Sequence, residues 1–168
     1  MTSRAPRFAA WLAFLLPASL LGGALISQYV FGLYPCEMCY WQRWPHWAAL
    51  VLGGIAVLAV KRVEGLGVAM ASLAAIAIAV SGLIGGFHAG VEYGWWEGLT
   101  RCATAAPMGN TTEDVLNSIM ANPLVRCDTA PWSLFGISLA GYNFLLSLAG
   151  ASAIYLLLRR RKTGTIAA

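Results

Sequence analysis

The sequence predicts an all-α membrane protein, built as a bundle of four transmembrane helices. Of its 168 residues, 59% are hydrophobic and only 11% are charged, and the mean hydropathy is +0.68. Soluble domains are about 25% charged, so the surplus of apolar side chains indicates a lipid environment. Four apolar stretches reach or approach the roughly 20 residues that a helix needs to cross a bilayer. They are Phe8–Val30, Trp44–Val60, Leu66–Phe87 and Leu134–Leu158.

The first two stretches each need a separate argument. Basic residues precede Phe8–Val30, as in a signal peptide, but the run exceeds the roughly 7–15 apolar residues of a signal core and no clear cleavage site follows. We therefore expect an uncleaved span at about 8–30. Trp44–Val60 is too short for a hydrocarbon core of roughly 30 Å. The second helix is therefore expected to begin near Cys39 and to span about 40–60.

The other two spans are expected at about 66–87 and 134–158, with a long loop between them. Inside this loop, Thr112-Glu113-Asp114-Val115 begins like the N-terminus of a helix, and apolar residues recur at helical spacing as far as Pro123. We expect a short amphipathic helix that lies on the membrane surface. Little chain remains for a soluble domain, so residues 1–168 are expected to form one membrane domain.

The distribution of charge predicts the orientation. Basic residues in short loops mark the cytoplasmic side of a membrane protein. Most of the 11 basic residues flank the ends of one side of a four-span topology: Arg4, Arg7, Lys61, Arg62, Arg159, Arg160, Arg161 and Lys162. Both termini are therefore expected in the cytoplasm, with loops 32–43 and 88–132 on the outer side of the membrane. Because the positive charge lies at helix ends rather than on one basic surface, nucleic acid is not an expected partner.

All 4 cysteines fall in the two predicted outer loops: Cys36, Cys39, Cys102 and Cys127. Disulfides persist outside the reducing cytosol, so this placement agrees with redox chemistry. Four cysteines allow three pairings. The simplest joins Cys36 to Cys39 within a CxxC motif and leaves Cys102 to pair with Cys127.

A CxxC motif at the start of a helix is a redox device for a physical reason. The partial positive charge of the helix N-terminus stabilises a nearby thiolate. Arg43 follows Cys39 by four residues and would lie one turn away on the same helix face, where it favours a Cys39 thiolate. The guanidinium is always charged and needs a polar partner at the bilayer surface. The alternative for Arg43 is a simple contact with lipid headgroups.

Less specific interpretations of these residues remain open. Zinc sites with a CxxC motif usually add a second such motif or histidines, and here only His46 and His88 are present, so no metal is expected. Structural disulfides are a second alternative, although closing so short a loop adds little stability. His88 is either an interfacial hydrogen-bonding residue or a neighbour of a bound cofactor, and His46 is interpreted as an interface or packing residue. Aromatic residues at the outer boundary suit an interfacial belt, and several of them would alternatively line a site for a flat aromatic molecule.

Several motifs together resemble the DsbB family of bacterial disulfide bond formation proteins. They are Pro35-Cys36-Glu37-Met38-Cys39-Tyr40-Trp41-Gln42-Arg43 at the start of the second span, His88 after the third span, Cys102 and Cys127 around the loop helix, and Leu134-Phe135-Gly136-Ile137-Ser138-Leu139. The resemblance covers nearly the whole chain. It implies a quinone-dependent thiol oxidase of the inner membrane that sustains disulfide formation in the periplasm.

The resemblance also implies a path for the electrons. A reduced periplasmic DsbA-like thiol oxidase attacks Cys102 of a Cys102–Cys127 disulfide, and Cys127 then attacks Cys36. Cys39 is released as a thiolate beside Arg43 and passes electrons to ubiquinone or menaquinone from the membrane pool. Cys39, Arg43 and His88 are the expected quinone-binding residues.

Two alternatives belong to other classes of protein. A vitamin K epoxide reductase-like enzyme also joins thiols to quinone, but its active CxxC is expected late in the bundle, whereas Cys36 and Cys39 follow the first span. A structural membrane protein would use its disulfides only to hold its outer loops together. Such disulfides would stay oxidised when quinone is removed, whereas catalytic ones would accumulate in the reduced form.

Overall fold

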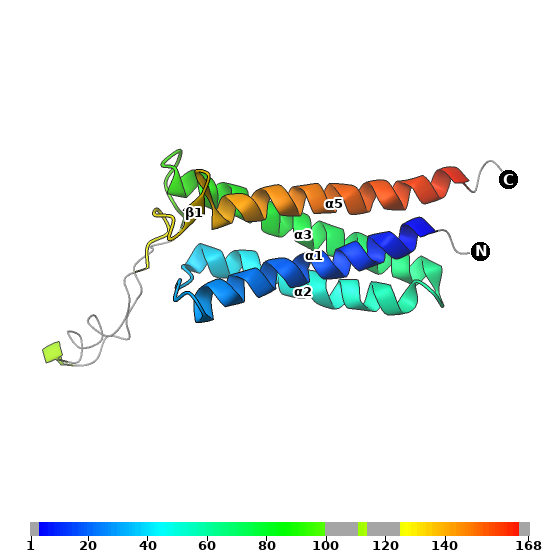
Figure 1. Cartoon of the computed structure of the whole chain (residues 1–168), viewed down its shortest axis with the longest axis horizontal. Helices are drawn as coiled ribbons and strands as arrows, with labels where there is room; N and C mark the ends of the chain where they lie inside the picture. Colours follow the sequence, from blue (N-terminus) through cyan, green and yellow to red (C-terminus); the bar gives the residue numbers. More distant parts are fainter. Residues whose placement is uncertain (1–3, 100–110, 114–124, 165–168) are drawn as a thin grey trace.

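The computed structural model describes residues 4–99, 111–113 and 125–164, and its long elements are all helices (Figure 1). These are α1 (Arg4–Tyr29), α2 (Glu37–Ala59), α3 (Glu64–Glu92) and α5 (Leu139–Gly164). Two short strands, β1 (Ser133–Leu134) and β2 (Ile137–Ser138), precede α5. The prediction of an all-helical protein is confirmed for this part of the chain. Cys102 and most of the predicted loop helix, from Asp114 onward, lie outside the described residues.

The four helices run side by side along the long axis of the molecule (Figure 1). The start of α1, the α2–α3 connection and the end of α5 share one end, which we call the termini end. The opposite end, the cysteine end, carries the α1–α2 connection and the hairpin of β1 and β2. Three helices are long and apolar enough to cross a membrane: α1, α3 and α5 as far as Arg160.

Helix α2 is not one of those three, because its first turns carry Gln42, Arg43 and His46 among the apolar residues. Its 23 residues are nevertheless about 34 Å long at roughly 1.5 Å per residue. It packs against both α1 and α3. A fourth span therefore stays a prediction.

Helix α2 begins before Trp44, as we expected because the apolar stretch Trp44–Val60 is too short to cross the membrane. Pro35 keeps the preceding residue out of helical geometry, and residues 32–36 are not helical. Cys36 is the N-cap, and its Sγ accepts a hydrogen bond from the backbone N–H of Cys39 at 3.3 Å. The predicted outer loop 32–43 is therefore too long, because residues 37–43 are already helical.

Two further boundaries differ from the sequence prediction. Helix α3 continues through His88 to Glu92, so His88 belongs to a helix and not to a loop that starts there. Helix α5 begins at Leu139 rather than at Leu134. The reason is a tight hairpin turn in which Phe135 and Gly136 both have positive φ, 50° and 76°. Ser138 then caps the helix, because its Oγ accepts a hydrogen bond from the Gly141 N–H at 3.1 Å.

The core toward the termini end is made mostly of alanine, with Val60, Ile78 and Ile154. Small side chains allow helices to approach closely in lipid, where burial of apolar surface supplies no driving force between them. Gly53 shows how close α1 and α2 are: a Cβ at this position would lie 2.5 Å from the carbonyl oxygen of Ala13. This packing fixes the bundle beneath the cysteine end.

Candidate functional site

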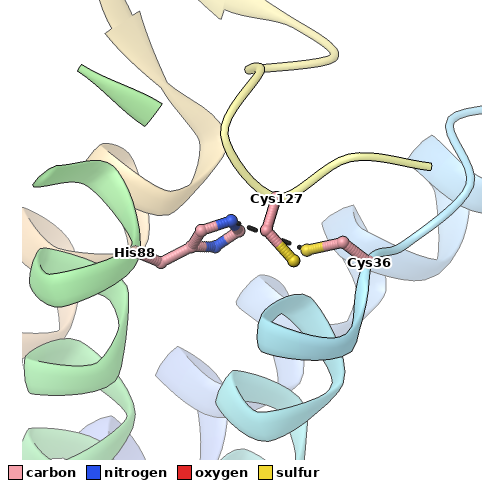
Figure 2. Close-up of side chains that lie close together, drawn as sticks. All are labelled: Cys36, His88 and Cys127. Atoms are coloured by element: carbon pink, nitrogen blue, oxygen red, sulfur yellow. Dashed lines mark hydrogen bonds between the residues drawn. The ribbon is translucent and has the colours of Figure 1, made fainter. Parts of the chain in front are cut away.

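Three buried side chains meet at the cysteine end, as Figure 2 shows. Cys36 comes from the start of α2, His88 from the last turns of α3, and Cys127 from the segment that precedes β1. Their exposed fractions are 6%, 1% and 1%. Their ligand atoms, two Sγ and one ring nitrogen, lie within 4.8 Å of one another. The fold thus brings together predicted site residues that are far apart in sequence.

The CxxC pair is present as two free thiols, so the predicted Cys36–Cys39 disulfide is not formed in this structure. The two Sγ atoms share a hydrogen bond at 3.0 Å. This hydrogen bond with Cys39 and, after it, the hydrogen bond from His88 lower the pKa of Cys36 to about 4 despite its burial. The geometry is that of a reduced redox pair with Cys36 as the thiolate.

The expected Cys39 thiolate stays a prediction, and in this reduced pair the groups that stabilise a thiolate gather at Cys36. Because α2 begins at Glu37, Cys36 and not Cys39 occupies the N-cap. Here the Cys39 N–H at 3.3 Å and His88 Nε2 at 3.5 Å both approach the Cys36 Sγ. The partial positive charge of the helix end acts on the same atom.

Cys127 is disulfide-bonded. The predicted pairing of Cys127 with Cys102 involves a residue outside the described part of the chain and stays a prediction. The disulfide also bears on metal binding, because a sulfur atom within a disulfide has no thiolate charge to offer a cation. The cluster of Cys36, His88 and Cys127 is therefore unsuited to a metal ion in this state.

Arg43 finds its partners on α1. Its Nη1 donates a hydrogen bond to Gln28 Oε1 at 2.6 Å, and its Nη2 donates one to the Ala24 carbonyl oxygen at 3.2 Å. The guanidinium also lies 5.4 Å from the centre of the Tyr40 ring. Arg43 is thus held against α1, one turn below Cys39. Lipid headgroups are not its sole polar partners.

A cavity of about 240 Å³ lies between the helices at this level. Its walls come from α1, α2, α3, α5 and the segment around Pro131, and most of the lining is apolar. Cys39 and Arg43 both line it, as does His88. The cavity therefore joins the CxxC motif to the interior of the bundle, and it contains the three residues that were expected to contact a cofactor.

Two side-chain amides, the buried Gln42 and the half-buried Asn143, connect the two histidines. Gln42 Nε2 donates to the Met38 carbonyl oxygen at 3.2 Å and lies 2.8 Å from His88 Nδ1, while Gln42 Oε1 accepts from Asn143 Nδ2 at 2.9 Å. These partners fix which end of the Gln42 amide is the donor. His88 Nδ1 is consequently an acceptor, and the proton of the neutral ring lies on Nε2, which faces Cys36.

Space for this network comes from Gly85 on α3. A Cβ at Gly85 would lie 2.9 Å from the Ala140 carbonyl oxygen, 3.0 Å from Asn143 Nδ2 and 3.1 Å from Gln42 Oε1. Gly85 packs α3 against α5. The structure adds that the same glycine leaves room for the amide pair.

Sequence reasoning missed Gln42, Ser81, Glu92 and Asn143 as site residues. Glu92 is the most notable of them, since it fell within the predicted outer loop 88–132. Its buried carboxylate places Oε1 3.8 Å from His88 Nε2, and its Oε2 has no hydrogen-bond partner among the described residues. A usable signal existed, because polar side chains within apolar spans are costly and are usually retained for function.

A family model and two curated relatives indicate the same family. The family model described as disulfide bond formation protein DsbB matches residues 6–157. A curated relative from Pseudomonas savastanoi pv. phaseolicola, named disulfide bond formation protein B 2, is 31% identical over 149 residues, which are 83% of this chain and 80% of the relative. The protein of the same name from Pseudomonas syringae pv. syringae is 30% identical over 148 residues, with the same coverage.

A third relative is an uncharacterised protein of Rickettsia prowazekii, 25% identical over 130 residues, which are 76% of this chain and 73% of the relative. No solved structure matches the chain.

Proposed function

The chain belongs to the DsbB family of disulfide bond formation proteins, and on that premise we propose that it is a quinone-dependent protein-disulfide oxidoreductase of the bacterial inner membrane. It reoxidises a periplasmic DsbA-like dithiol protein and passes the electrons to a membrane quinone. The observation that carries this proposal is the meeting of Cys127 with Cys36 directly beside a cavity that Cys39 and Arg43 line.

The proposal includes a topology of four spans in one membrane domain over 1–168, with both termini in the cytoplasm. Its support is that Arg4, Lys61 and Arg159 all belong to the termini end, whereas Cys36 and Cys127 belong to the other. A reporter that is active only in the periplasm should be inactive when fused after Lys162 and active when inserted near Gly109. The reverse pattern would place the cysteines in a reducing compartment and contradict the proposal.

The proposed order of exchange is the one that the family resemblance implies. The reduced partner attacks Cys102, the Cys127 thiolate is released, and Cys127 attacks Cys36 of the oxidised CxxC pair, so that the Cys36–Cys39 bond breaks and Cys39 leaves as a thiolate. The second thiolate of the partner then displaces Cys102, which leaves the partner oxidised, and Cys102 attacks Cys127, which re-forms the Cys102–Cys127 disulfide and releases Cys36 as a thiolate. The reduced Cys36 and Cys39 would then close to a disulfide again as their two electrons pass to the quinone. The net reaction moves two electrons and two protons from the dithiol partner to the quinone. The buried contact of Cys127 with Cys36 supports the middle step.

The cavity suits a flat, mostly apolar ring with polar oxygens at its edge. Apolar walls with a few placed polar groups are the usual make-up of a ligand pocket. Arg43 presents only hydrogen-bond donors, which match quinone oxygens, and Cys39 stands one turn above it. A bound quinone supplies the acceptor for the two electrons. The residues present fit that role, and they do not by themselves distinguish ubiquinone from menaquinone.

The test is anaerobic mixing of the purified protein with a reduced DsbA-like protein and a short-chain ubiquinone, with quinone absorbance as the readout. Quinone should be reduced in step with oxidation of the partner, and Cys39→Ser should abolish the reaction. Ser72→Ala is the matched control, because the Ser72 hydroxyl donates to the Val68 carbonyl of its own helix, away from the site. Disulfides that stay oxidised when quinone is removed would indicate a structural role instead.

A second test addresses the order of exchange. Cys127→Ser should trap a mixed disulfide between Cys102 and the partner, because the resolving cysteine is missing. Peptide mapping of the adduct identifies the attacked residue. An adduct on Cys36 or Cys39 would contradict the proposed relay.

A further inference from the structure

His46 lies on α2 and lines the cavity together with Arg43. Its side chain is buried, with an exposed fraction of 3%. Ring atom Nε2 is 2.8 Å from Asn143 Oδ1. Ring atom Nδ1 has no hydrogen-bond partner among the residues that the structure describes. An unpartnered ring nitrogen inside a bundle is costly, and it indicates a polar partner that enters the cavity.

The hydrogen bonds around Asn143 identify which nitrogen of His46 carries the proton. Asn143 Nδ2 donates to Gln42 Oε1 at 2.9 Å and to the Ser81 carbonyl oxygen at 3.2 Å. Asn143 Oδ1 is therefore an acceptor, and it also accepts from Ser147 Oγ at 2.9 Å. His46 Nε2 must donate to that oxygen, so in the neutral ring Nδ1 carries a lone pair and no hydrogen.

A quinone and its hydroquinone differ in the hydrogen bonds that they can make. The oxygens of a quinone only accept, whereas the hydroxyl groups of a hydroquinone also donate. Arg43 offers donors alone. His46 lies three residues after Arg43 on α2, so helical spacing places the two side chains near the same face. Arg43 is the donor of this pair, and His46 Nδ1 is the acceptor.

We propose that His46 Nδ1 accepts a hydrogen bond from a hydroxyl group of a hydroquinone bound in the cavity, so that the site holds the reduced ligand more tightly than the quinone. This inference rests on the proposed quinone-dependent function and deepens it. His46 acts here as a ligand-binding residue for the product of electron transfer. A tenfold preference for hydroquinone corresponds to a rise of about 30 mV in the potential of the bound two-electron couple, which favours oxidation of the thiol pair.

The affinity of each ligand form provides the test. Binding of a short-chain ubiquinone and of its hydroquinone is measured anaerobically, with full-length protein in lipid nanodiscs and in a Cys39→Ser background that prevents turnover. His46→Leu should weaken hydroquinone binding about tenfold, the effect of losing one buried hydrogen bond, and should change quinone binding less than about twofold. His46→Gln keeps a donor for Asn143 and an acceptor for the ligand, and should restore part of the hydroquinone affinity. Ser72→Ala should change neither affinity.

A spectroscopic readout covers the case in which His46→Leu fails to fold. In protein with native His46 and ¹⁵N-labelled histidine, the Nδ1 resonance should lie in the unprotonated range and shift on addition of hydroquinone but not of quinone. A protonated Nδ1 without ligand, or equal shifts with both ligands, would overturn the inference. Equal weakening of both ligands by His46→Leu would overturn it and leave the proposed function intact. If neither ligand binds the parent protein, the proposed function fails as well.

Discussion

The two ends of this bundle are held together by different physical means. At the termini end, alanines such as Ala10 and Ala74 allow close helix contact within a hydrophobic core cluster. At the cysteine end and in the middle of the bundle, Gln42, Ser81 and Asn143 join the helices through hydrogen bonds. The same four helices are therefore joined by close packing of small side chains at one end and by hydrogen bonds between polar side chains at the other.

This difference indicates where stability and function separate. Close packing of small side chains holds the helices together but offers no reactive group, so it contributes to stability and not to the reaction. A buried polar network is costly unless every member is paired. In this bundle the network holds two histidines in place: His88, whose Nε2 faces the Cys36 sulfur, and His46, which lines the cavity. A change at the cysteine end should therefore affect the reaction more than the fold, and a change at the termini end should do the reverse.

The largest effect is expected for Gly85→Val. The added side chain would press on the Ala140 carbonyl oxygen and on both amides of the network, separating α3 from α5. Overpacking of this kind costs about 1–3 kcal/mol of stability, and the displaced amides should lower quinone turnover by about 100-fold. Gly53→Val is the matched variant at the termini end, where the clash is with the Ala13 carbonyl oxygen.

Turnover kinetics and urea unfolding in detergent distinguish the two variants. Gly53→Val should lose comparable stability and keep the quinone KM of the unmodified protein. Equal effects of both variants on KM would remove the distinction between the two ends.

Arg43→Met should raise the quinone KM by about 10- to 100-fold, the usual range for a hydrogen bond to a charged group. Arg43→Lys keeps the charge but cannot contact both Gln28 and Ala24 as the guanidinium does, so it should recover only part of the affinity. Steady-state quinone kinetics are compared with single-turnover exchange between the protein and its dithiol partner. Equal loss in both assays would assign Arg43 to helix packing.

The pH dependence of Cys36 sharpens the comparison further. In a reduced Cys102→Ser/Cys127→Ser background, ultraviolet thiolate absorbance should persist at neutral pH and be lost only as the pH falls through the Cys36 pKa of about 4. Cys39→Ala removes the largest cause of this low pKa, and His88→Leu removes a smaller one. Both variants should lose the thiolate at higher pH than the parent does, with the greater shift for Cys39→Ala. Unchanged titration in both would contradict the hydrogen-bonding scheme.

The smallest effect is expected for Ser147→Ala. Its hydroxyl donates to Asn143 Oδ1 within the network at 2.9 Å, so its removal should cost about 0.5–1.5 kcal/mol in unfolding free energy. Ser72→Ala should cost less, because the Ser72 hydroxyl only supplements a carbonyl of its own helix. Equal costs would indicate that the network adds nothing beyond ordinary helix contacts.

Much of this protein is determined by its sequence alone. Long apolar stretches predict the helices because lipid offers no hydrogen bonds, so the backbone N–H and C=O groups must bond to each other. The CxxC motif, with Pro35 before it, predicts that a helix begins at the redox pair, and α2 does begin beside it. Boundaries were predicted less well: the hairpin at Phe135-Gly136 depends on positive φ angles that hydropathy cannot reveal.

Only the tertiary structure decided which side chains meet. The hydrogen bonds of Gln42 with His88 and of Asn143 with His46 join residues that are 46 and 97 positions apart, so no local pattern contains them. Likewise, Arg43 donates to Gln28 on α1 because a charged group inside a bundle needs a polar partner. The sequence determines which groups are available for chemistry, and the packing of the helices determines their partners, their protons and their access to the cavity.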